Sequence, residues 1–122
     1  MPKKILLIED HVATAEAMLA YLKLRGFEVV VAYDGPSGLE KAAAEMPDLI
    51  LLDVMMQGMS GIEVCERLAN DPKTSKIPIV IVSVKAAAED VRTGKEAGAE
   101  DYVIKPFDPK KLLKVIKNIL KE

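Results

Sequence analysis

The chain has 122 residues, the size of one ordinary domain, and half of its residues are hydrophobic. Its 17 basic and 19 acidic side chains give a net charge of -2, so no general attraction to nucleic acid is expected. The single cysteine, Cys65, excludes an intrachain disulfide.

The apolar runs are short, and Leu49–Leu52 is typical of them. A membrane span needs roughly 20 apolar residues, and the N-terminus has too short an apolar segment for a secretory signal. We therefore expect one domain over residues 1–122, in the cytoplasm, without direct contact to nucleic acid or membrane. A stand-alone protein and a piece of a longer one both remain open.

Five short runs rich in Ile and Val predict β-strands, at Ile5–Ile8, Val29–Val31, Leu49–Leu52, Ile79–Val82 and Tyr102–Ile104. Because the runs are mostly continuous rather than alternating, they indicate strands that are covered on both faces of a parallel sheet. Helical patterns follow each run, at about 12–25, 35–46, 60–69, 86–97 and 108–120. The fourth is the weakest, because Gly94 lies inside it.

This alternation predicts an α/β fold, a flavodoxin-like (βα)5 three-layer sandwich with one five-stranded parallel sheet in the order 2-1-3-4-5. In such a sheet, ligands bind beyond the carboxyl ends of the strands. Polar residues follow four of the predicted strands at this edge: Glu9, Asp10, Asp53, Ser83 and Lys105.

Three carboxylates at one edge repel one another unless a cation joins them, and oxygen ligands of this kind suit Mg²⁺. Lys105 adds a positive charge and Ser83 a hydroxyl donor, so the edge suits a doubly charged oxyanion beside a metal. Asp53 could then act as a nucleophile and form an aspartyl phosphate. Taken singly, Asp10 could equally cap the first helix and Lys105 could be solvated. The combination favours the phosphoryl site.

The sequence resembles the receiver domain of two-component response regulators, most closely single-domain regulators of the chemotaxis type, along nearly its whole length. The similar motifs are Ile5–Asp10, Leu49–Met56, Gly58–Gly61, Ala97–Tyr102 and Lys105–Phe107. The resemblance implies phosphorylation of Asp53 by a histidine kinase or a histidine phosphotransfer protein. It also implies self-directed phosphotransfer and autodephosphorylation rather than turnover of a substrate by an enzyme.

The resemblance further implies residue roles. Asp10 and Asp53 would ligate Mg²⁺ directly with the backbone carbonyl of Met55, and Glu9 would act through a metal-bound water. Ser83 and Lys105 would contact phosphoryl oxygens, and the Lys105–Pro106 peptide bond would be cis. Ser83 and Tyr102 would form the switch that alters the face of the fourth helix, fifth strand and fifth helix. That face would then signal to a downstream target protein or output domain, and homodimerisation on phosphorylation remains open.

Three positions depart from the family pattern. Glu9 stands where Asp is frequent, but Glu is a common variant there and should preserve metal binding. Gln57 stands where proline is usual, which predicts a less rigid loop after Asp53. Val84 stands where a small residue is usual, which predicts restricted access of water to an aspartyl phosphate.

Three other functions are alternatives for a sequence of this fold class. An aspartyl-phosphate hydrolase would need a second acid where Met55 stands, and a flavin-binding module would need a phosphate loop where Glu9 and Asp10 stand. A receiver-like interaction module, which only binds partners, would not need the intact set of Asp10, Asp53, Ser83 and Lys105.

Overall fold

The computed structural model describes residues 2–122 and contains five strands that alternate with five helices. The strands are β1 (Lys4–Ile8), β2 (Glu28–Ala32), β3 (Leu49–Leu52), β4 (Ile79–Ser83) and β5 (Asp101–Ile104). The helices are α1 (Val12–Leu24), α2 (Gly35–Glu45), α3 (Gly61–Asn70), α4 (Ala88–Glu96) and α5 (Pro109–Leu120).

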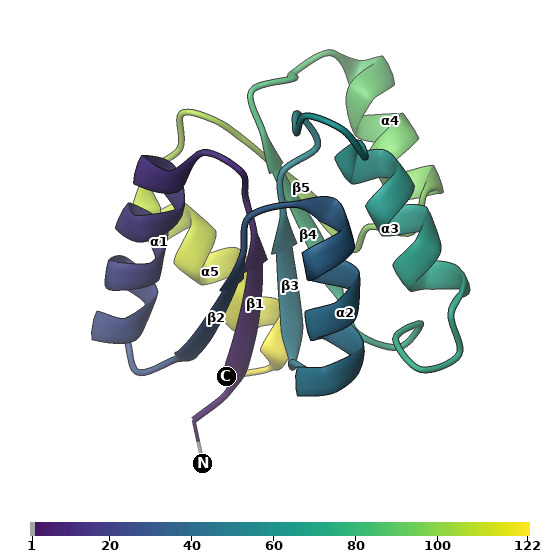
Figure 1. The fold of residues 1–122 in the computed structure, drawn as a ribbon. Helices are drawn as coiled ribbons and strands as arrows, with labels where there is room; N and C mark the ends of the chain where they lie inside the picture. Colours follow the sequence, from purple (N-terminus) through teal and green to yellow (C-terminus); the bar gives the residue numbers. More distant parts are fainter. Residues whose placement is uncertain (1) are drawn as a thin grey trace.

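All pairings in the sheet are parallel, and the strand order is β2-β1-β3-β4-β5. Helices α1 and α5 cover one face of the sheet, and α2, α3 and α4 cover the other (Figure 1). The predicted fold class and strand order are therefore confirmed.

Two cores lie on the two faces of the sheet. Ile5 and Leu7 of β1 pack toward α1 and α5, whereas Leu6 and Ile8 pack toward α2 and α3. All four side chains are at most 2% exposed. Each such side chain stabilises the fold by about 2 kcal/mol through burial, which explains why the central strands read as unbroken apolar runs.

Side chains define several of the helix starts that the sequence predicts. Asp34 accepts a hydrogen bond from the Ser37 amide at 2.7 Å, and Ser60 accepts one from the Glu63 amide at 3.2 Å. The alternative in which Asp10 caps α1 is wrong, because the N-cap residue is His11.

Within residues 2–122, none of the helices has both the length and the apolar character needed to cross a bilayer.

Helix α4 begins two residues later than the sequence pattern predicts, at Ala88. Its N-cap residue is Ala87, which has no side-chain acceptor, so the first turn lacks a side-chain cap. Residues 84–87 therefore form a loop between β4 and α4, next to the carboxyl edge of the sheet.

Candidate functional site

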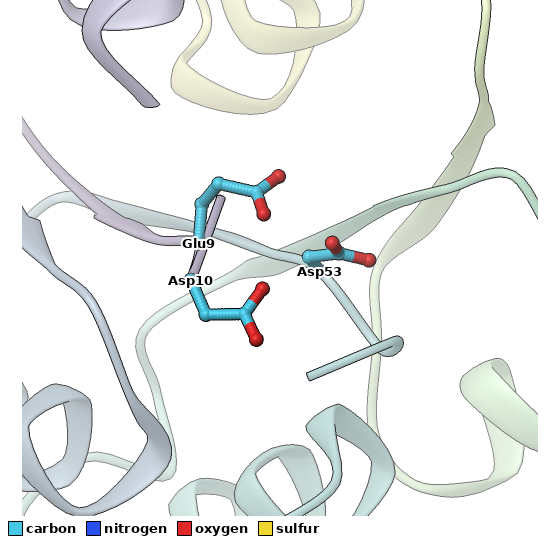
Figure 2. Close-up of side chains that lie close together, drawn as sticks. All are labelled: Glu9, Asp10 and Asp53. Carbon is cyan, nitrogen blue, oxygen red and sulfur yellow. The ribbon is translucent and has the colours of Figure 1, made fainter. Parts of the chain in front are cut away.

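Three carboxylates meet where β1 and β3 end side by side. β1 stops at Ile8, and the Asp53 amide donates to the Ile8 carbonyl at 3.1 Å, which continues the pairing of the two strands by one residue. Glu9, Asp10 and Asp53 each place a carboxylate oxygen within 4.8 Å of the others. Figure 2 shows the side chains of Glu9 and Asp10 extending toward the side on which Asp53 lies. The predicted convergence of the three acids is therefore observed.

Backbone amides of the loop after β3 hold two of these carboxylates. The Met55 amide donates to Asp53 Oδ1 at 3.0 Å, and the Gln57 amide donates to Asp10 Oδ2 at 3.1 Å. Proline has no amide hydrogen, so the departure at Gln57 supplies a bond that proline could not make. This bond ties the loop to Asp10 and opposes the loosening that the sequence predicts at Gln57.

Lys105 reaches the acids from the end of β5. Its ammonium lies 2.8 Å from Glu9 Oε1 and 3.7 Å from Asp53 Oδ2. The Lys105 amide donates to the Ser83 carbonyl at 2.8 Å, which fixes the end of β5 beside β4. The Lys105–Pro106 peptide bond is cis, as predicted.

The electrostatics of the site favour an additional cation. Glu9 is only 2% exposed, and this burial raises the pKa of its carboxyl above the ordinary value. Hydrogen bonds from Lys105 and the His11 amide oppose the rise, whereas the charge of Asp53 adds to it. Three carboxylates face one lysine, so the donor set fits a hard divalent cation such as Mg²⁺.

The carboxylates and Lys105 line one cavity of about 760 Å³, together with Met55, Gln57 and Val84 among others. Ser83 is fully buried and is not among the lining residues. Its Oγ accepts a hydrogen bond from the Lys85 amide at 3.2 Å. The Tyr102 hydroxyl donates to the carbonyl of the same residue, Lys85, at 2.8 Å. The backbone of Lys85 thus joins the two residues that the sequence analysis paired as a switch.

Gly61 also belongs to the site, although the sequence identifies it only as part of a motif. Gly61 begins α3 beside the loop that follows β3 (residues 53–60, here called the acceptor loop because it begins with Asp53), and a Cβ at this position would collide with the carbonyl oxygen of Asp53 and with Val54 Cα. The Gly61 amide donates to the Val54 carbonyl at 3.1 Å. The motif Gly58–Gly61 was the available signal, but the close approach of two backbone segments is visible only in three dimensions.

Comparison with known proteins places this geometry in a family. The family model described as "Response regulator receiver domain" matches residues 5–117. The chain belongs to the response-regulator receiver family. It is therefore a receiver domain of two-component signal transduction.

The similar proteins include longer regulators and isolated receivers. The chain is 43% identical to the response regulator PleD of Caulobacter vibrioides over 88% of this chain and 24% of that protein. It is 42% identical to the DNA-binding response regulator MtrA of Mycobacterium tuberculosis, over 93% of this chain and 48% of that protein. A CheY-like receiver structure from Methanospirillum hungatei superposes with a TM-score of 0.92 at 30% identity, covering 99% and 95% of the two chains. The chain thus spans less than half the length of these curated relatives.

Proposed function

We propose that this receiver accepts a phosphoryl group on Asp53 from a phosphohistidine of a histidine kinase or phosphotransfer protein, in a Mg²⁺-dependent reaction. The observation that supports this most directly is the shared cavity of Asp53, two further carboxylates and Lys105. A carboxylate oxygen of Asp53 forms the new O–P bond as the P–N bond of the donor breaks. The electron pair of that bond stays on the departing imidazole nitrogen.

The residues of this chain would act on charge and position. Asp10, Asp53 and the Met55 carbonyl would hold Mg²⁺, and Glu9 would act through a metal-bound water. When bound, the ion would neutralise charge on the transferring oxygens. Lys105, whose ammonium lies 3.7 Å from Asp53 Oδ2, would pair with another phosphoryl oxygen.

Ser83 would link the phosphoryl group to the signalling surface. Its Oγ accepts from the Lys85 amide, and its hydroxyl would donate to a phosphoryl oxygen. Tyr102, bonded to the Lys85 carbonyl, would respond to a movement of this loop and alter the face formed by α4, β5 and α5. That face would contact the downstream target protein or output domain.

The test is incubation with Mg²⁺ and acetyl phosphate, followed by intact-protein mass measurement. Wild type should gain one phosphoryl group, and Asp53→Asn should gain none. Asp34→Asn is the matched control, because Asp34 lines the same cavity and Asn is an equally good helix N-cap. Equal labelling of wild type and Asp53→Asn would refute the proposal, and rapid turnover of the donor without a lasting adduct would favour a hydrolase instead.

A further inference from the structure

Helix α4 is held to the sheet in an unusual way, because its only buried residue is Gly94. Glycine is a poorer helix former than alanine, so this position weakens the helix from within. At the N-terminus of α4, Ala87 has no side chain that could cap the helix. The Asp90 carboxylate accepts a long hydrogen bond, of 3.3 Å, from the Ala87 amide. At Gly94, where α4 lies against Ile81 of β4 and Tyr102 of β5, the helix therefore presents its backbone rather than an inserted side chain.

The space beside Gly94 is already filled. A Cβ at this position would lie 2.8 Å from Ile81 Cδ1, 3.0 Å from Tyr102 Cδ2 and 3.1 Å from Tyr102 Cε2. Ile81 is fully buried in the core, so it has no free volume into which to move. Tyr102 is only partly buried and lies next to solvent. The tyrosine ring is thus the group that would yield.

We infer that Gly94 is a positioning residue for Tyr102. The missing side chain lets the Tyr102 ring lie against α4 while its hydroxyl reaches the Lys85 carbonyl at 2.8 Å. The packing part of this inference stands alone, and its consequence for signalling rests on the proposed function. The Tyr102 ring packs directly against the backbone of α4 at Gly94. A movement of the ring therefore changes the packing of α4 on the sheet. A signal at Asp53 would therefore pass to α4 by direct contact.

The packing part is tested in metal-free, unphosphorylated protein by a crystal structure and amide NMR of Gly94→Ala. We expect the Tyr102 ring to swing outward, the bond to the Lys85 carbonyl to be lost, and the Lys85 amide signal to shift. Lys95→Ala, an exposed change next in sequence on the same helix, should leave ring and signal unchanged. A Gly94→Ala ring that stays in place with its hydrogen bond intact would overturn the inference.

A mutant cycle keeps the test decisive if Gly94→Ala folds poorly. Removing the ring with Tyr102→Ala should make room for the added methyl group, so Gly94→Ala should lower Tm markedly in wild type and little in the Tyr102→Ala background. Equal losses of Tm in both backgrounds would show that the conflict does not involve Tyr102, and the inference would be wrong.

The signalling part is tested by titrating Mg²⁺-loaded protein with beryllofluoride. We expect Gly94→Ala to weaken binding by about fivefold or more, because Ser83 depends on a Lys85 backbone that has lost its Tyr102 contact. Unchanged binding in a variant whose ring has moved would disprove the coupling while leaving the packing result intact. If wild type itself bound no beryllofluoride, the proposed function would fail, and the metal-free result would still decide the packing.

Discussion

The Lys105 ammonium donates a 2.8 Å hydrogen bond to Glu9 Oε1, although the two residues are 96 positions apart in the chain. Glu9 is almost completely buried, and the Lys105 side chain is 19% exposed. This contact joins the start of the chain to the end of β5. Breaking such a pair would leave a buried charge without compensation. The Lys105 ammonium also lies 3.7 Å from Asp53 Oδ2.

The first prediction concerns the removal of this ammonium. Lys105→Met should lower the unfolding free energy at neutral pH by about 3 kcal/mol, because Glu9 is left buried and unpaired. Phosphorylation by acetyl phosphate should slow by about a hundredfold, since one charge-stabilising donor is lost. Urea titrations and time courses of labelling measure the two effects. Lys110→Met, at an exposed lysine of α5, should change neither the unfolding free energy nor the labelling rate.

The pH dependence of that loss has a definite sign. The Lys105 hydrogen bond lowers the pKa of Glu9, so the pKa rises further in Lys105→Met. A carboxyl with a raised folded pKa stabilises the fold below its unfolded pKa and loses that contribution as the pH increases. The difference between wild type and Lys105→Met should therefore shrink as the pH falls toward about 4. A difference that grows on acidification would contradict this electrostatic explanation.

The second prediction separates the backbone of residue 57 from its side chain. Gln57→Pro should lower the unfolding free energy by about 1 kcal/mol, because the amide hydrogen that donates to Asp10 is removed while proline rigidifies the unfolded chain. Gln57→Ala keeps the amide and should be within about 0.5 kcal/mol of wild type. Chemical denaturation of both variants in metal-free buffer provides the measurement. Equal stabilities would mean that the Asp10 contact contributes no more than the gain that proline brings by rigidifying the unfolded chain.

Much of the architecture followed from the sequence, and the reason is visible in β1 and β3. Each run is apolar at every position because successive side chains are buried on opposite faces of the sheet. Both the strands and the parallel sheet could therefore be predicted. The convergence of Glu9, Asp10 and Asp53 followed in turn, because neighbouring parallel strands end at the same edge.

The remaining features depend on contacts between segments that are distant in sequence. The Gln57 amide bonds to Asp10 across 47 positions, and Gly61 lies against the backbone of the acceptor loop. The apolar pattern predicts that α4 starts at Ala86, two residues before its actual start, because Ala86 and Ala87 continue the pattern and no side-chain N-cap marks the start of the helix. A local sequence pattern does not show which distant segments come into close contact, or which backbone amides form hydrogen bonds with them. It also leaves the ends of helices uncertain by one or two residues.

The third prediction tests the close approach at Gly61. Gly61→Ala should destabilise the fold by about 2 kcal/mol, because the new methyl group meets backbone atoms of Asp53 and Val54 that cannot move independently. Labelling of Asp53 should also slow, since the acceptor loop is displaced. Ser60→Ala costs about 1 kcal/mol by removing the neighbouring N-cap, but it should leave the labelling rate unchanged. Similar labelling rates in the two variants would argue against a role of Gly61 in placing Asp53.

The fourth prediction concerns the lifetime of the aspartyl phosphate. Val84 is 57% exposed and lines the cavity that also contains Asp53 and Lys105. Its branched side chain would hinder an attacking water, so Val84→Ala should dephosphorylate several times faster than wild type. Val84→Thr keeps the shape of the side chain and should match the wild-type rate if bulk is the cause. Loss of phosphate can be followed after removal of excess acetyl phosphate, and equal rates in Val84→Ala and wild type would refute the steric explanation.

The last prediction uses the buried thiol of Cys65 on α3, which is fully enclosed in the core beside Val64 and Leu68. Burial raises the pKa of Cys65 to about 11, with a smaller contribution from Glu66. The unfolded chain ionises this thiol near pH 8.5, so stability is complete below about pH 8 and falls as the pH rises through the folded pKa. The loss should approach about 2 kcal/mol by pH ~10.5. Cys65→Ala is less stable at neutral pH but lacks the titrating group, so its unfolding free energy should fall less steeply between pH ~8 and ~10.5. Parallel curves for the two proteins would show that the thiol is not held in its protonated form by the fold.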